Sequence, residues 1–95
     1  MRESKIERDF CKYATKSGCI AYKFSSPARR GVPDRLIVCP NGVSFFIEFK
    51  NETGNLSVMQ LREIQKLRDR GQRVYVCDHK GQAETILDLE LTGAV

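Results

Sequence analysis

Apolar residues recur every three or four positions near the start of the chain, as on one face of a helix: Ile6, Phe10, Tyr13 and Ala14. Gly18 follows at the place where a helix commonly ends, so the pattern predicts a helix over Ser4–Ser17. A second helix is predicted over Val58–Arg70, with Gly71 ending it and with three leucine or isoleucine side chains on its buried side: Leu61, Ile64 and Leu67. A short closing helix is predicted over Gln82–Leu89.

Four shorter stretches are typical of β-strands: Cys19–Phe24, Asp34–Cys39, Val43–Lys50 and Arg73–Asp78. In the third, alternation places Ser44, Phe46, Glu48 and Lys50 on one face and the intervening apolar residues on the other. Residues 40–42 form an Asn-Gly turn, so the second and third strands make a hairpin. Residues 25–33, with two prolines and a glycine, and residues 51–55 are predicted loops.

The predicted order is helix, three strands, helix, strand, helix. This order indicates an α/β fold in which helices flank a mixed sheet. The second helix joins the last two strands and can serve as a right-handed crossover between parallel neighbours. We expect residues 1–95 to form one domain, because a chain of this length builds one modest core.

Composition narrows the class of protein. Hydrophobic residues make up 41% of the chain and charged residues 29%, a balance typical of globular domains. No stretch approaches the roughly 20 apolar residues that span a bilayer. The charged start of the chain has no apolar export segment, so we expect a cytoplasmic protein with no membrane partner. The formal charge of +4 suits a polyanionic partner such as nucleic acid.

The four cysteines form no C-x-x-C pair and each lies in an apolar stretch: Cys11, Cys19, Cys39 and Cys77. This favours small buried side chains over a zinc site or disulfides.

Two carboxylates and an amine are predicted to share one end of the hairpin. Asp34 begins one strand, while Glu48 and Lys50 lie two residues apart on the other. Carboxylate oxygens bind hard divalent cations, and an ammonium group attracts an anionic substrate. Phosphodiester hydrolysis needs both groups. The backbone carbonyl of Phe49 is a further candidate ligand.

Pro33-Asp34 followed by Glu48-Phe49-Lys50 resembles the PD-(D/E)xK nuclease motif. The longer run over residues 23–35 resembles the virus-type replication-repair nuclease (VRR-NUC) branch of that superfamily, of the stand-alone phage type. The resemblance implies a restriction-endonuclease-like αβββαβ core and an endonuclease that uses Mg²⁺ or Mn²⁺ and no organic cofactor. It also implies DNA as partner, with branched DNA such as a Holliday junction cut by a homodimer.

The resemblance assigns roles to individual residues. The metal ligands would be Asp34, Glu48, the Phe49 carbonyl and Glu7, which matches the family's glutamate on the first helix. The catalytic set would be Asp34, Glu48 and Lys50 with Glu7 and with Gln60, which matches the family's glutamine on the later helix. The DNA contacts would be Lys23, Arg29, Arg30 and Arg35. The loop over residues 51–55 departs from the family, because such loops are often more basic.

Structural interpretations stand beside these roles. Asp34 can be a turn residue, and Glu48 and Lys50 can form an ion pair on a solvated strand. Ser4–Glu7 and Ser57–Gln60 both fit a capping box, although helical spacing also points Gln60 inward. The arginines of residues 25–33 can be solvated. At the level of function, a non-catalytic DNA-binding subunit with the same fold is the alternative, and a metal-free protein-interaction domain is a third.

Overall fold

The computed structural model of the chain describes residues 3–50 and 54–93. Its elements are α1 (Glu3–Lys16), β1 (Ile20–Lys23), β2 (Arg35–Val38), β3 (Ser44–Phe49), α2 (Val58–Asp69), β4 (Val74–Cys77) and α3 (Lys80–Thr92). The order of helices and strands is the predicted one. Most bounds differ from the prediction by one or two residues.

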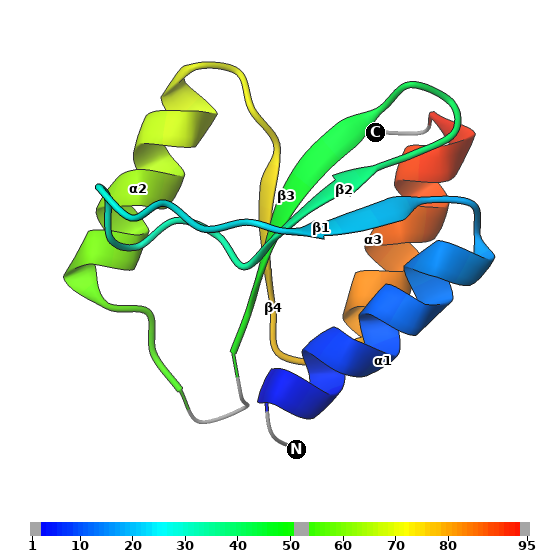
Figure 1. Cartoon of the computed structure of the whole chain (residues 1–95), viewed down its shortest axis with the longest axis horizontal. Coiled ribbons are helices and arrows are strands. Elements are labelled where there is room, and N and C mark those ends of the chain that lie inside the picture. The colour runs from blue at the N-terminus through cyan, green and yellow to red at the C-terminus, as the bar shows by residue number, and fades with distance from the viewer. Residues whose placement is uncertain (1–2, 51–53, 94–95) are drawn as a thin grey trace.

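The four strands form one sheet in the order β1-β2-β3-β4. The β1/β2 and β2/β3 pairs are antiparallel, whereas β3 and β4 are parallel. The crossover that joins the parallel pair contains α2 and lies on one face of the sheet, while α1 and α3 lie together on the other face (Figure 1). This architecture confirms the predicted mixed sheet flanked by helices.

The main core lies between the sheet and the α1/α3 layer. On α1 the predicted stripe of Ile6, Phe10 and Ala14 is fully buried. The rings of Phe10 and Phe49 pack 5.6 Å apart, which ties α1 to the end of β3. Because alternate β3 residues face this layer, Phe49 anchors the strand while its neighbours Glu48 and Lys50 face elsewhere.

On the opposite face, α2 buries fewer side chains than its pattern predicts. Ile64 is buried and Leu67 half-buried, but Leu61 is 53% exposed, so its predicted place on the buried side was wrong. The reason is the rotation of the helix. Gln60 faces the sheet, and Leu61 is turned about 100° away from it along a helix of 3.6 residues per turn.

The closing helix is longer than predicted, because α3 begins at Lys80 and ends at Thr92 rather than covering 82–89. Gly93 caps it in the left-handed conformation, with φ of 72°. Its last turn brings the buried carboxylate of Glu90 to the sheet, where Arg73 and Tyr75 donate hydrogen bonds of 2.7 and 2.6 Å. Because this anchor is a polar side chain, the spacing of apolar residues did not indicate that the helix continues past Leu89.

The cysteines are free thiols, as predicted, and three are buried: Cys19, Cys39 and Cys77. Burial raises the pKa of Cys77 to about 12 and, together with a hydrogen bond to Cys19, that of Cys39 to about 12. Cys39 and Cys77 are therefore neutral at physiological pH. None of the helices described in residues 3–50 and 54–93 is long and apolar enough to cross a bilayer.

Candidate active site

The hairpin register brings Asp34 beside Glu48. Arg35 pairs with Ile47 in the antiparallel ladder, so one further step sets Asp34 opposite Glu48. Opposite residues in such a ladder share a face of the sheet. A carboxylate oxygen of Asp34 (Oδ2) accepts a hydrogen bond of 2.8 Å from the backbone N–H of Phe49. Asp34 is therefore bound to the end of β3, which a turn residue alone does not explain.

Glu48 is 3% exposed, so it does not belong to a solvated strand face. The Gln60 side-chain amide donates a hydrogen bond of 2.8 Å to its Oε2 atom. Because Glu48 is buried, the interpretation of it as part of an ion pair on a solvated strand was wrong. The carboxylate is instead held between the sheet and the first turn of α2.

Gln60 carries out both tasks that its sequence position allowed. Its side-chain Oε1 atom accepts a hydrogen bond of 2.8 Å from the backbone N–H of Ser57, and the backbone N–H of Gln60 donates to the Ser57 hydroxyl. This is the predicted capping box. The other end of the same amide binds Glu48. Helix initiation and orientation of the buried carboxylate are thus coupled through one side chain.

Lys50 follows Glu48 and Phe49 out of β3, and its side chain is 25% exposed. Its ammonium group donates a hydrogen bond of 2.7 Å to the Gly54 carbonyl and lies 3.9 Å from the carboxylate of Asp78. The Oδ1 atom of Asp78 lies 2.6 Å from the Nδ1 atom of His79. This hydrogen bond lowers the pKa of the Asp78 carboxyl below its usual range. Asp78 was not among the residues predicted from the sequence. The signal was available, because parallel β3 and β4 end at the same sheet edge.

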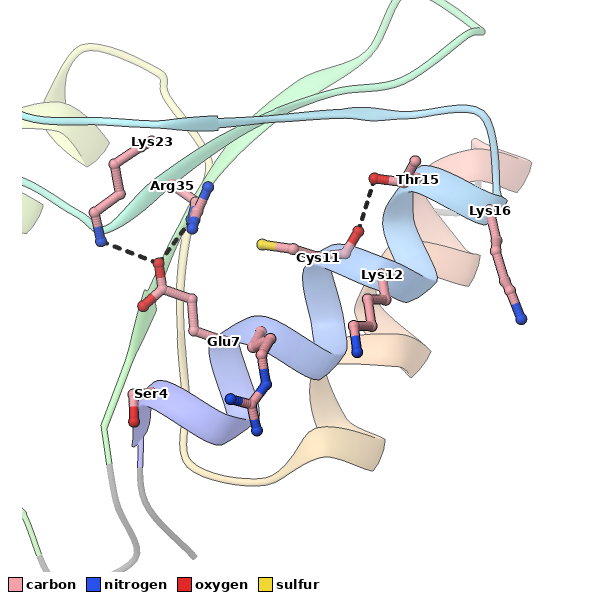
Figure 2. Close-up of a pocket in the computed structure, with 9 residues that line it drawn as sticks. Ser4, Glu7, Cys11, Lys12, Thr15, Lys16, Lys23 and Arg35 are labelled. Carbon is pink, nitrogen blue, oxygen red and sulfur yellow. Dashed lines mark hydrogen bonds and ion pairs between the residues drawn. The ribbon is translucent and has the colours of Figure 1, made fainter.

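Glu7 approaches from the α1 side, where it lies between two cations (Figure 2). Its Oε2 atom accepts hydrogen bonds of 2.7 Å from Arg35 and 3.1 Å from Lys23. Burial raises the pKa of Glu7, but these bonds outweigh it and hold the pKa below the ordinary value. Ser4 lies inside α1 and not before it, so the capping-box interpretation of Glu7 was wrong.

The expected ligand set of Asp34, Glu48 and Glu7 does not assemble. In the part of the chain that the structure describes, no three His, Cys, Asp or Glu side chains gather closely enough to hold a metal ion together. The reason is that successive side chains of a strand point to opposite faces of the sheet. Lys23 and Arg35 are register partners, and Arg35 pairs with Ile47, whose side chain faces the α1 layer. Glu7 therefore meets Arg35 on the face opposite Glu48.

The loop before Asp34 is docked on α2. Arg29 donates two hydrogen bonds, of 3.1 and 2.6 Å, to one carboxylate oxygen of Glu63, while Arg30 is exposed. Gly31 adopts a φ of +83°, and a Cβ atom there would lie 2.5 Å from the Met59 carbonyl oxygen. Arg29 is thus a paired side chain, and this part of the loop packs directly on the helix that carries Gln60.

Residues 51–53 of the predicted loop after Lys50, including Asn51 and Glu52, lie outside the described residues. The remaining geometry defines a polar edge of the sheet where two carboxylates face α2 and one ammonium group lies nearby. The donors from Phe49 and Gln60 are neutral, so these two bonds orient the carboxylates without cancelling their charge. Such a site suits a cation bound through oxygen, next to a group that attracts phosphate.

The chain is similar in sequence and in fold to known proteins. The family model described as "VRR-NUC domain" matches residues 4–80. A protein of Acyrthosiphon pisum secondary endosymbiont phage 1, named "Putative nuclease p44", is 46% identical over 78 residues, which cover 82% of this chain and 84% of that protein. A solved structure titled "VRR_NUC domain" has a TM-score of 0.82 at 30% identity, covering 90% of this chain and 94% of its own. Another, "VRR_NUC domain protein", shares the fold with a TM-score of 0.73 at 15% identity, covering 96% and 90%.

Proposed function

The chain belongs to the VRR-NUC domain family, and from this premise we propose that it is an endonuclease that hydrolyses DNA phosphodiester bonds with the help of Mg²⁺ or Mn²⁺. One observation carries the proposal. Asp34 and Glu48 are fixed by two hydrogen bonds of 2.8 Å at adjoining positions of one sheet edge, and Lys50 leaves the same edge.

The donor set fits a hard divalent cation. We propose that the carboxylates of Asp34 and Glu48 and the backbone carbonyl of Phe49 hold the ion, with solvent completing its shell. When bound, the ion makes water more acidic and polarises the scissile phosphate. Glu7 has a different place in this proposal from the one expected, because it orients Arg35 and Lys23 toward the substrate backbone.

The side chains of this protein supply the remaining steps. An ammonium group has three N–H donors, and the bond from Lys50 to Gly54 uses one of them. The other two can orient the attacking water and stabilise the negative charge that develops on phosphorus oxygens. Gln60 keeps Glu48 in position through the same reaction. Arg30 and Arg35 meet phosphates on either side of the cut, and Arg29 does so from its pair with Glu63.

Branched DNA is the substrate that we propose, and a homodimer is the form that acts on it. One site cuts one strand, so symmetric cutting of a four-way junction requires two sites related by a twofold axis. Light scattering at micromolar concentrations should therefore report twice the mass of the 10.8 kDa chain. A monomer alone would remove junction resolution from the proposal and leave nicking.

Cleavage of labelled DNA tests the function itself. Wild-type protein, Asp34→Ala, Lys50→Ala and the control variant Lys66→Ala are incubated with a four-way junction and with a linear duplex, in Mg²⁺, Mn²⁺ or EDTA. We expect cleavage by the wild type and the Lys66 variant only, abolished by EDTA. The Asp34 and Lys50 variants should lose roughly 100-fold or more in rate.

The other outcomes are equally informative. Cleavage that persists in both site variants would refute the site. Binding of DNA without cleavage in either metal would favour the non-catalytic DNA-binding subunit instead.

A further inference from the structure

A basic groove runs along the outer side of α1, on the face of the sheet opposite Glu48. It has a volume of about 640 Å³ and nine lining residues, of which five are Lys or Arg and one is acidic. The basic residues are Arg8, Lys12, Lys16, Lys23 and Arg35. Since Glu7 alone opposes five cations, the groove carries a formal charge equal to the +4 of the whole chain. The rest of the chain therefore has a formal net charge of zero, with 11 basic and 11 acidic residues.

Three of the cations extend the positive surface beyond the residues expected to contact DNA. Arg8, Lys12 and Lys16 are exposed, and in the described part of the chain no carboxylate forms an ion pair with any of them. Their spacing of four residues places them along one side of the helix. Figure 2 shows the side chains of Lys12 and Lys16 extending outward from α1, with Lys23 and Arg35 beside Glu7 at the other end of the groove.

The groove and the site meet only through β2, because Arg35 lines the groove and the residue before it, Asp34, belongs to the site on the other face of the sheet. Lys23 is the register partner of Arg35 on β1. Both donate to Glu7, which leaves the helix one residue before Arg8. A phosphate chain that passes from the scissile position around the start of β2 to this face would meet Arg35 and Lys23 first and then the cations of α1.

The dimensions fit a nucleic-acid backbone. Eight residues of helix separate Arg8 from Lys16, which is a rise of about 12 Å. One DNA strand advances about 3.4 Å per phosphate along its axis, so the row of cations spans roughly three or four phosphates. A lipid surface would require large apolar side chains next to the cations. The other lining residues are instead Ser4, Cys11 and Thr15.

We propose that Arg8, Lys12 and Lys16 form a phosphate track that holds the DNA arm leaving the active site along α1. This inference rests on the proposed function, which it deepens by assigning a second contact region on the DNA. The track binds without base contacts, so it contributes affinity and direction and no sequence preference.

Binding and cleavage assays on a matched pair of triple variants test the track. The track variant is Arg8→Gln, Lys12→Gln, Lys16→Gln. The control is Arg62→Gln, Lys66→Gln, Arg70→Gln. It removes the same charge at the same spacing from α2 and its C-cap residue, on the other face of the sheet (Figure 1). Fluorescence anisotropy with a labelled duplex in EDTA gives the affinity over a series of KCl concentrations.

The track variant should bind about tenfold more weakly near 0.1 M salt. The slope of log affinity against log salt should fall by about 0.9 per lost phosphate contact, while the control keeps the wild-type slope. Lys12→Gln alone should show about one third of the slope change, which guards against misfolding of the triple variant. Equal slopes in the two triple variants would refute the track.

Cleavage in Mn²⁺ separates this inference from the proposed function. A wild type that cleaves, with a track variant as active and as tightly bound as the control, would refute the track alone. A wild type that binds with the predicted salt dependence but does not cleave would refute the nuclease proposal and leave the track supported.

Discussion

Glu48 illustrates how one residue is set apart from its strand neighbours. An ionised carboxylate is costly to bury unless polar groups or a cation compensate it. This one is 3% exposed and accepts a hydrogen bond from the neutral amide of Gln60. A bond from Lys or Arg would cancel its charge, whereas an amide orients the carboxylate and preserves that charge. This hydrogen bond therefore leaves Glu48 suited to a cation.

Substitutions of Gln60 should separate its two tasks. Gln60→Glu keeps an acceptor for the Ser57 N–H and so preserves the capping box, but it replaces the donor to Glu48 with a second carboxylate. We expect cleavage to fall roughly 10- to 100-fold. Thermal stability should also fall at neutral pH, because the two carboxylates repel each other, and it should recover as the pH is lowered. Gln60→Ala should lose both activity and about 1 kcal/mol of stability.

Gln65→Glu is the matched control for Gln60, because Gln65 lies on the same helix and donates its side-chain hydrogen bond to Asp69 at the surface. Comparable activity losses at positions 60 and 65 would show that Gln60 has no special role.

The Glu7 carboxylate gives a pH-dependent prediction. Its pKa is lowered in the folded protein, so its ion pairs stabilise the fold fully above the unfolded value near 4.5, and this contribution is lost as the pH falls through the folded pKa. Glu7→Gln should therefore lower the free energy of unfolding by about 1–2 kcal/mol at pH 7. The gap between wild type and variant should narrow below pH 4.5 in urea unfolding curves. A gap that is independent of pH would contradict these ion pairs.

At the level of elements, the position of α2 depends on the loop before β2. Gly31 has a φ of +83°, and a Cβ atom there would lie 2.5 Å from the Met59 carbonyl oxygen and 2.9 Å from the Gln60 nitrogen. These are backbone atoms of the first helical turn, so they cannot move without displacing the helix. The loop therefore helps to set the distance between Gln60 and Glu48.

Gly31→Ala should destabilise the protein by about 2 kcal/mol or more and reduce cleavage, because the first turn of α2 must shift. Gly42→Ala is the matched control. Its φ is +88°, which carries the same conformational penalty, but a Cβ atom there meets nothing within 4 Å. We expect it to cost about 1 kcal/mol and leave cleavage unchanged. Denaturant unfolding and cleavage rates are measured on both variants. If the two substitutions had equal effects on stability and cleavage, the contact between residue 31 and the first turn of α2 would have no special role.

Most elements and the core of the site follow from local pattern. Alternation in β3 indicated that Glu48 and Lys50 face away from Phe49, and the capping box at Ser57 marked the start of α2. What failed depends on contacts between segments. The exposure of Leu61 follows from the contact of Gln60 with Glu48, and the partners of Glu7 follow from the β1/β2 register. Neither contact has a signal within one segment.

Across the whole molecule, the two ends of the β3/β4 pair have different tasks. The candidate site lies where β3 and β4 end, whereas Arg73 and Tyr75 at the start of β4 bind the buried carboxylate of Glu90. Burial and this hydrogen bond raise the pKa of Tyr75 to about 12. These hydrogen bonds hold α3 against the sheet and stabilise the fold.

Glu90→Ala should destabilise the protein by about 2–4 kcal/mol, because it leaves Arg73 and Tyr75 without their shared acceptor. Cleavage per folded molecule, measured well below the lowered melting temperature, should stay within about twofold of wild type, since a site residue would cost far more. A large loss of cleavage in fully folded variant protein would mean that the two ends are coupled.

The proposed site is tested most directly by locating the ion. Crystals grown with Mn²⁺ would be measured near the manganese absorption edge, where anomalous scattering identifies the metal. We predict one peak within about 2–2.5 Å of oxygen atoms of Asp34, Glu48 and the Phe49 carbonyl, with the amide of Gln60 still on Glu48. A peak bound elsewhere, or none at this edge of the sheet at millimolar Mn²⁺, would contradict the account.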